Sequence, residues 1–224
     1  MRIVRGAVVS LAMILLSAPL IHAQDLSKYR DFAFGMSVAT VSKQSDQQTA
    51  EVKVVHRRPG LIEESAWYPP QPFGSSRPAE PVGQILFSFY NGVLYRMVIT
   101  YDSDAIKGLT DEDMTRALSA KYGVATKPVA DVSFPTNPSY RATEQIIARW
   151  EDSRYSLDLF RPSSSHTFAV VMFEKSVDAQ AAISIAASVQ LEQQEAPQKE
   201  ADRVKKQADD LEGERRKNIE TLRP

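Results

Sequence analysis

The sequence contains no cysteine and, after residue 23, only two histidines, His56 and His166. Without cysteine there can be no disulfide, no thiol catalysis, no Cys-type zinc or iron–sulfur site and no lipidation at an N-terminal cysteine. Two histidines far apart in the sequence do not supply the converging ligands of an imidazole metal site. We therefore expect a fold held by its core alone, with no metal and no cofactor.

The usual sequence signatures of catalysis are also missing. No Gly-Lys-Ser/Thr sequence is present to bind phosphate. Residues 35–39 resemble a nucleophile elbow, but Ala39 replaces its second glycine. Ser163–His166 places serine beside histidine in sequence only, whereas a triad forms in space. Asp102–Asp104 lacks the rest of a calcium loop, so we expect no catalytic or metal-binding residue.

The charges are nearly balanced, with 27 basic and 28 acidic residues. Loss of residues 1–23 would remove two arginines and lower the net charge from -1 to -3, which gives no basic face for nucleic acid. Neighbouring carboxylates occur at Glu63–Glu64, Asp111–Asp113 and Glu151–Asp152. They leave open an alternative function, a carboxylate-based hydrolase of the cell envelope.

The N-terminus has the three parts of a secretory signal. Arg2 and Arg5 precede the apolar run Ala7–Leu16, and Ala23 offers a small residue for cleavage before Gln24. The rival interpretation is an uncleaved anchor, but a membrane span needs about 20 apolar residues. We expect a signal peptide at 1–23, a periplasmic or secreted mature protein, and no later transmembrane span.

Local signals predict the first elements of the mature chain. Ser37 is a plausible N-cap for a short helix, and alternating valines in Glu51–His56 predict a strand. The segment Pro69–Gly83 contains five prolines and predicts a long loop; a polyproline ligand is the alternative. Asn91–Gly92 inside Ile85–Tyr101 predicts an antiparallel hairpin with a two-residue turn.

A two-residue turn also predicts which residues face each other across that hairpin. The expected pairs are Tyr90–Val93, Phe89–Leu94 and Phe87–Arg96. The expected faces are Ile85, Phe87, Phe89, Leu94 and Val98 on one side, and Leu86, Tyr90, Val93, Tyr95, Met97 and Ile99 on the other. Both faces are largely apolar, so we expect both to be covered.

The later part of the chain repeats the order of helix, loop and strands. Thr110 and Asp113 have the spacing of a capping box, and Gly123 fits the end of that helix. A loop is expected at 125–140, followed by strands at 144–150, 155–161 and 167–174. The fold class is therefore α+β: an antiparallel sheet with helices packed on it. We expect one globular domain at 24–176, with two similar halves at 24–104 and 105–176.

The C-terminal region has a different composition. Residues 177–196 predict an Ala-rich helix, and Pro197 is expected to interrupt it. Residues 197–224 predict a charged helical tail that projects from the body, with Val204 and Leu211 among its few apolar positions. Their three-and-four spacing indicates a weak coiled coil, and a merely solubilising tail is the alternative.

Aromatic residues give the remaining candidates for a binding surface. Trp67 and Tyr68 precede the proline-rich loop, and Tyr90, Tyr95 and Tyr101 are expected on one hairpin face. Core packing is the alternative explanation of these side chains. The absence of catalytic patterns favours a noncatalytic binding or scaffold protein. Its expected partner is a protein of the cell envelope, contacted through the C-terminal helix.

One stretch resembles a known family. Phe34-Gly-Met-Ser37 with Val41, followed by Ile85-Leu-Phe-Ser-Phe-Tyr-Asn-Gly-Val-Leu94, is similar to small outer-membrane-assembly lipoproteins with two helices and three strands. The resemblance covers about residues 32–101 and implies that α+β fold with a noncatalytic scaffold role. This chain departs from the family in lacking the lipidated cysteine, in its long Pro69–Gly83 loop, and in continuing with a second α+β half and a charged tail.

Overall fold

The computed structural model describes residues 25–46, 51–70, 81–134, 143–163, 165 and 167–222. The expected signal peptide and the centre of the proline-rich loop lie outside these residues. The helices are α1 (Val38–Gln44), α2 (Asp111–Tyr122) and α3 (Lys175–Thr221). The strands of the described residues are β1 (Lys28–Tyr29), β2 (Phe32–Ala33), β3 (Lys53–His56), β4 (Ile62–Trp67), β5 (Val82–Tyr90), β6 (Val93–Tyr101), β7 (Asp131–Ser133), β8 (Thr143–Glu151), β9 (Tyr155–Phe160) and β10 (Ala169–Glu174).

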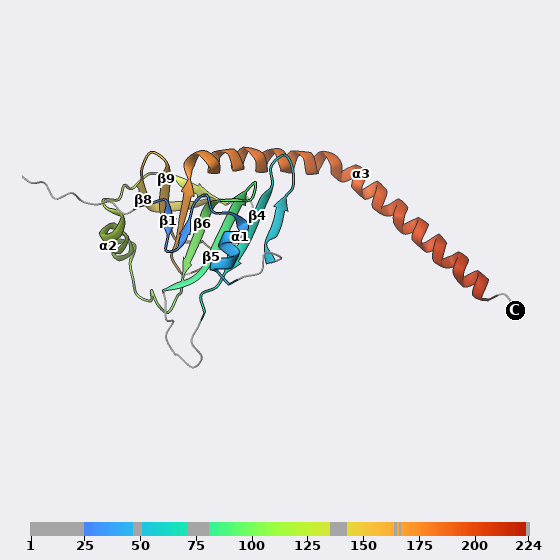
Figure 1. Cartoon of the computed structure of the whole chain (residues 1–224), viewed down its shortest axis with the longest axis horizontal. Coiled ribbons are helices and arrows are strands. Elements are labelled where there is room, and N and C mark those ends of the chain that lie inside the picture. The colour runs from blue at the N-terminus through green and yellow to red at the C-terminus, as the bar shows by residue number, and fades with distance from the viewer. Residues whose placement is uncertain are drawn as a thin grey trace, which may run out of the picture.

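The expected α+β class is confirmed. Eight strands form an antiparallel sheet in the order β3-β4-β5-β6-β10-β9-β8-β7, and β1 and β2 form a separate hairpin (Figure 1). The order is symmetrical about the β6–β10 pair. Each half of the sheet consists of four strands consecutive in the chain, β3 to β6 after α1 and β7 to β10 after α2. A shared origin of the two halves stays a prediction.

The predicted helix caps are confirmed. The Ser37 side chain accepts a hydrogen bond from the backbone N–H of Thr40 at the start of α1. Thr110 and Asp113 form a complete capping box at the start of α2. Gly123 ends α2 with a φ of 87°, which favours glycine. Its carbonyl accepts a hydrogen bond of 3.0 Å from the indole N–H of buried Trp150, which ties this helix end to β8.

The Asn91–Gly92 turn is confirmed, but the predicted faces beyond it are partly wrong. Both turn residues have positive φ, and Tyr90–Val93 and Phe89–Leu94 pair as expected. The register then shifts, so Arg96 pairs with Ser88 rather than with Phe87. Tyr95 is the extra residue of this β-bulge, and such an insertion moves every later side chain to the opposite face.

The shift redistributes the apolar side chains of β6. Met97 and Ile99 join Phe87 in one core, whereas Val98 packs with Leu86 on the other face. Tyr101 packs against the first core, so it does not share a face with Tyr90 and Tyr95. Both faces of the sheet are buried, as the composition of the hairpin predicted.

The main core lies between one face of the sheet and the segments that cover it. These segments are the β1–β2 hairpin, α1 and α2 (Figure 1). The largest fully buried side chains of this core are Ile85, Phe87, Phe89, Leu94, Met97, Ile99, Trp150, Leu157, Leu159 and Phe168. Burying an aromatic or aliphatic side chain of this size contributes about 1.5–3 kcal/mol, so this face supplies most of the driving force for folding.

The second face is covered by the first part of α3 and by residues around β7. Val132 and Phe134 pack over Phe160, and Ala181 and Ile185 of α3 pack over Ile62. The strands β1, β2, β4 and β7 were not predicted. Buried positions in β4 recur every three residues rather than every two, and β7 has only three residues, inside the loop expected at 125–140.

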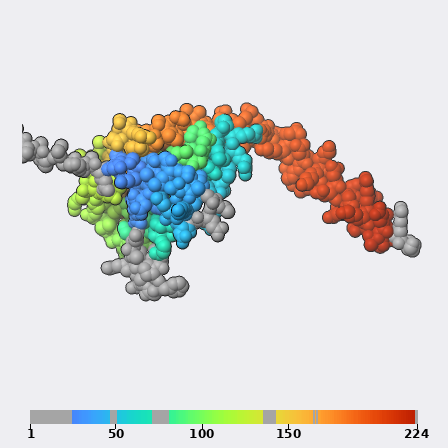
Figure 2. Space-filling model, viewed as in Figure 1, coloured from blue at the N-terminus to red at the C-terminus, as the bar shows by residue number. Residues whose placement is uncertain are grey.

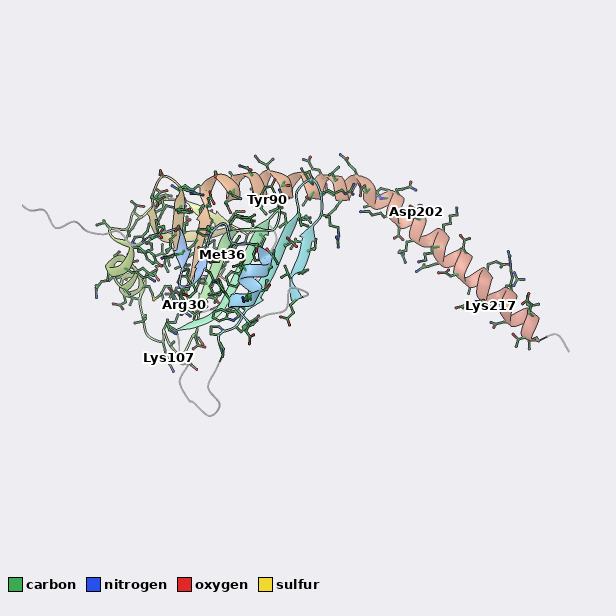
Figure 3. All side chains as sticks on the ribbon, viewed as in Figure 1. Arg30, Met36, Tyr90, Lys107, Asp202 and Lys217 are labelled. Carbon is green, nitrogen blue, oxygen red and sulfur yellow. The ribbon has the colours of Figure 1, made fainter. Side chains whose placement is uncertain are left out.

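The helix α3 runs continuously through Pro197, so the predicted interruption is wrong. A proline inside a helix removes one hydrogen bond and bends it, and the turns on each side maintain the helix. Figure 3 shows α3 changing direction on the body side of Asp202. Beyond this bend the helix stands clear of the rest of the chain, as predicted, and the space-filling view shows the same (Figure 2).

Candidate functional sites

A polar cavity lies on the second face of the sheet, under the first turns of α3. It is lined by Glu64, Leu86, Ser88, Tyr95, Arg96, Val98, Ser133, Phe134, Asp178, Ala182 and Ile185, and has a volume of about 70 Å³. We call it the Arg96 cavity. Register places Glu64, Ser88 and Arg96 directly opposite one another on β4, β5 and β6. Three polar side chains therefore form a row across three neighbouring strands of the sheet.

Arg96 is fixed by contacts on several sides. Its guanidinium donates to the Asp178 carboxylate on α3 at 2.8 Å and to the backbone carbonyl of Ser133. The guanidinium carbon also lies 5.2 Å from the ring centroid of Phe134 and 5.7 Å from that of Phe173. Its side chain is only 11% exposed, and a buried charge of this kind needs such partners. Arg96 therefore links the sheet, β7 and α3.

Two hydroxyls line the same cavity without hydrogen bonds. Within the described part of the chain, neither the Ser88 nor the Tyr95 hydroxyl has a hydrogen-bond partner, although both residues are 4% exposed. Burial raises the pKa of the Tyr95 phenol, and the nearby carboxylates of Asp178 and Glu64 raise it further, against the opposing effect of Arg96. The phenol therefore stays neutral and able to donate.

The projecting part of α3 is the second candidate site. From residue 201 to residue 222 every residue is exposed except Glu212 and Gly213, which are partly exposed. Val204 is 52% exposed and Leu211 is 68% exposed. The projecting helix presents Asp202 and Lys217 well away from the body in Figure 3. Two of the predicted partner contacts are thus accessible.

The three aromatic candidates lie in different environments. Trp67 packs edge-on against Phe32, with 5.7 Å between ring centroids, as part of the main core. Tyr68 is 65% exposed, and its hydroxyl accepts a hydrogen bond from Gln84. Tyr95 is buried under α3, so a protein partner cannot reach it at the surface while α3 stays in place. The three residues do not form one surface.

The carboxylates proposed for the alternative hydrolase mostly serve structural contacts. Asp111 pairs with Arg161 at 2.9 Å, and Glu151 pairs with Lys175 at 2.6 Å. Asp113 belongs to the capping box, and hydrogen bonds from Thr110 hold the pKa of that carboxyl below its usual range. Asp152 accepts hydrogen bonds from two backbone N–H groups in the β8–β9 turn, as its turn sequence predicted. In Glu63–Glu64, only Glu64 lines the Arg96 cavity.

The other residues considered for catalysis or metal binding either make structural contacts or lie outside the described residues. The His56 Nδ1 atom lies 3.0 Å from the Glu192 carboxylate of α3. Ser163 donates to the Glu144 carboxylate, and His166 lies outside the described residues. No group of three or more His, Asp or Glu side chains that could hold a metal occurs in the described ranges. Among the described residues, no helix is both long and apolar enough to cross a membrane.

Comparisons with family models, with curated proteins and with solved structures found no match to this chain. The resemblance of residues 32–101 to outer-membrane-assembly lipoproteins therefore stays a prediction. The function must therefore be inferred from the Arg96 cavity and the projecting part of α3.

Sequence reasoning missed the Arg96 cavity, although one signal was present. Arg96 stands alone among the apolar and aromatic residues of Val93–Tyr101, and a lone charge in a buried strand needs a partner. That partner, Asp178, lies 82 residues further along the chain, and no local pattern connects the two.

Proposed function

We propose that this protein is a noncatalytic binding protein of the periplasm or cell exterior that contacts a protein partner through the projecting part of α3. The observation that carries the proposal is the exposure of residues 201–222, a helical segment that adds nothing to the core. Ordering a helix outside the folded body costs conformational entropy, and no burial of apolar surface offsets that cost. Contact with another molecule would supply the missing burial.

The helix indicates what kind of partner it would take. Ala201, Val204, Ala208, Leu211 and Leu222 follow a three-and-four spacing that places them along one side. We propose that a helix of another envelope protein packs along this stripe as a short coiled coil. Arg215 interrupts the stripe, so the partner helix would present an acidic or polar side chain at that level.

The body of the protein supports the noncatalytic part of the proposal. Most of the carboxylates considered for a hydrolase hold a cap, a turn or an ion pair in place. General acid–base catalysis needs a carboxyl with a raised pKa, whereas hydrogen bonds lower the pKa of Asp113. The export part of the proposal rests on the signal-like residues 1–23.

The test uses three immobilised proteins against a detergent extract of the source cell envelope. They are the mature chain, the chain ending at Pro197, and a double variant with Val204→Asp and Leu211→Asp. We expect one stoichiometric partner to bind the mature chain and to be lost with both altered proteins, because charge on the stripe prevents its burial.

A matched control keeps the stripe and changes the opposite side of the same helix. Lys206→Ala with Glu220→Ala leaves the net charge unchanged, and both residues are exposed. This control should retain the partner. Equal capture by the mature chain and the truncated chain would refute the proposal and leave the tail a solubilising segment.

A further inference from the structure

We propose that the Arg96 cavity is a binding site for a small organic amine, whose ammonium group is held by Tyr95, Ser88 and Glu64 and whose short apolar chain lies against α3. This site is independent of the projecting part of α3. Its failure would leave the proposed protein contact untouched.

The unpartnered hydroxyls carry the proposal. The Ser88 and Tyr95 hydroxyls line the accessible space of one cavity and have no hydrogen-bond partner among the described residues, whereas the fully buried hydroxyls without a partner, those of Tyr122 and Ser184, lie outside its lining. Both cavity hydroxyls are therefore available to accept a hydrogen bond from a bound group. Since both line the same space, one bound group with several donors would satisfy both.

The charges around the cavity select the class of ligand. Among the described lining residues, Glu64 and Asp178 are acidic and Arg96 is basic, so these residues together carry a net negative charge. The guanidinium of Arg96 already donates to Asp178 and to the Ser133 carbonyl, which leaves it poorly placed to bind an anion. A carboxylate has about four acceptor positions, so Glu64 can accept from an ammonium in addition to its existing contact.

The apolar walls and the volume of the cavity determine which carbon chain the bound amine can carry. Leu86, Val98, Phe134, Ala182 and Ile185 make the remaining lining apolar. The volume of about 70 Å³ is roughly half that of an engineered cavity of about 150 Å³ that binds benzene. By that proportion the cavity holds about three non-hydrogen atoms, so an ammonium and its first two carbons fit, and the rest of a longer chain would extend past Ala182 on the exposed side of α3.

The test compares three probes of similar size: n-propylammonium, 1-propanol and propionate. Binding to the mature chain is followed by two-dimensional NMR of backbone amides. We expect n-propylammonium to shift resonances of β4, β5 and β6 with a dissociation constant in the millimolar range. 1-Propanol should bind at least tenfold more weakly, and propionate should give no saturable shift. Equal binding of propionate, or no saturable shift with the amine, would overturn the proposal.

Variants locate the bound amine. Tyr95→Phe and Ser88→Ala remove one hydroxyl each and should weaken the amine about tenfold, the effect of one hydrogen bond to a charged group. Ala182→Leu fills the rim from an exposed position and should abolish the shifts. Tyr122→Phe removes a buried hydroxyl outside this cavity and should leave affinity unchanged. Unchanged affinity in both Ala182→Leu and Tyr95→Phe would place the amine elsewhere and refute the site.

Discussion

The two parts of one helix, α3, lie in opposite environments, one packed on the sheet and one exposed. Its first part lies on the sheet and buries Ala181, Ser184, Ile185 and Ser188, whereas residues 201–222 bury none of their side chains. Both parts are continuous helix, but residues 175–196 contain six alanines and four charged residues, whereas residues 201–222 contain two alanines and twelve charged residues. The difference teaches that helix formation alone does not assign a segment to the core. What assigns it is the match between a small-residue face and a surface that can receive it.

The surface that receives the first part is shaped for a close approach. Gly60 leaves room where a side chain would meet Ser184 and Tyr90, and the Ser188 hydroxyl donates to the backbone carbonyl of Arg58. Ion pairs add little to this contact. Arg58–Glu195 is largely exposed, and exposed pairs contribute about 0–1 kcal/mol each. Packing therefore holds this part of the helix, and packing ends near the bend at Pro197.

The largest expected effect comes from placing the same charge in each part of the helix. Ala181→Asp buries a carboxylate against Ile62 and Tyr95 and should lower the free energy of unfolding by about 3 kcal/mol or more. Ala208→Asp in the projecting part should cost less than about 1 kcal/mol, the difference in helix propensity. Urea denaturation followed by tryptophan fluorescence measures both, and equal losses would contradict the division of α3.

A smaller effect comes from adding one methyl group at two glycines. The new Cβ in Gly60→Ala would lie 2.5 Å from Ser184 Oγ and 2.6 Å from a Tyr90 ring carbon, so we expect a loss of about 1–3 kcal/mol. Gly213→Ala meets no atom within 4 Å and should strengthen its helix locally by about 1 kcal/mol. Hydrogen exchange should slow in the projecting part only. A fall in the global stability of Gly213→Ala would show that this part has contacts with the body.

The smallest effect concerns the opposite face of the sheet. The Tyr122 hydroxyl is buried without a partner among the described residues, and burial raises its pKa to about 12. Tyr122→Phe should therefore be neutral or stabilising by up to about 1 kcal/mol at pH 8.

The pH dependence gives that prediction a second readout. A tyrosine with a raised pKa in the folded state contributes stability that is complete below pH 10 and is lost as pH rises toward 12. Wild-type protein should lose more stability between pH 8 and pH 11 than Tyr122→Phe. A clear loss of stability in the variant at pH 8 would instead reveal a hydrogen bond to this hydroxyl.

The sequence predicted best those features that depend on near neighbours. The caps at Ser37 and Thr110 and the Asn91–Gly92 turn each need only residues within about four positions, and all three are present. The bulge at Tyr95 was invisible because register beyond a turn depends on which pairing best fills both cores. Among the strands that the sequence missed, β4 lacks the alternation that identifies a strand, and β7 alternates over only three residues.

The two candidate sites also differ in whether neighbouring residues in the sequence are enough to predict them. The projecting helix followed from its own composition, so the exposure of Val204 and Leu211 could be predicted from the sequence. The Arg96 cavity needs a bulge, three strands and a helix 82 residues away in the chain, and could not be assembled from local patterns. Tyr95 was chosen for the wrong reason, since it lies beneath α3 rather than on a partner surface.

The most direct test of the divided helix is the stability of the mature chain after deletion of residues 198–224. The free energy of unfolding, from urea denaturation of the truncated and full-length mature chains, should agree within about 0.5 kcal/mol, because the deleted side chains are exposed. A loss of more than about 3 kcal/mol would contradict the account, since an isolated projecting helix cannot contribute so much to the fold.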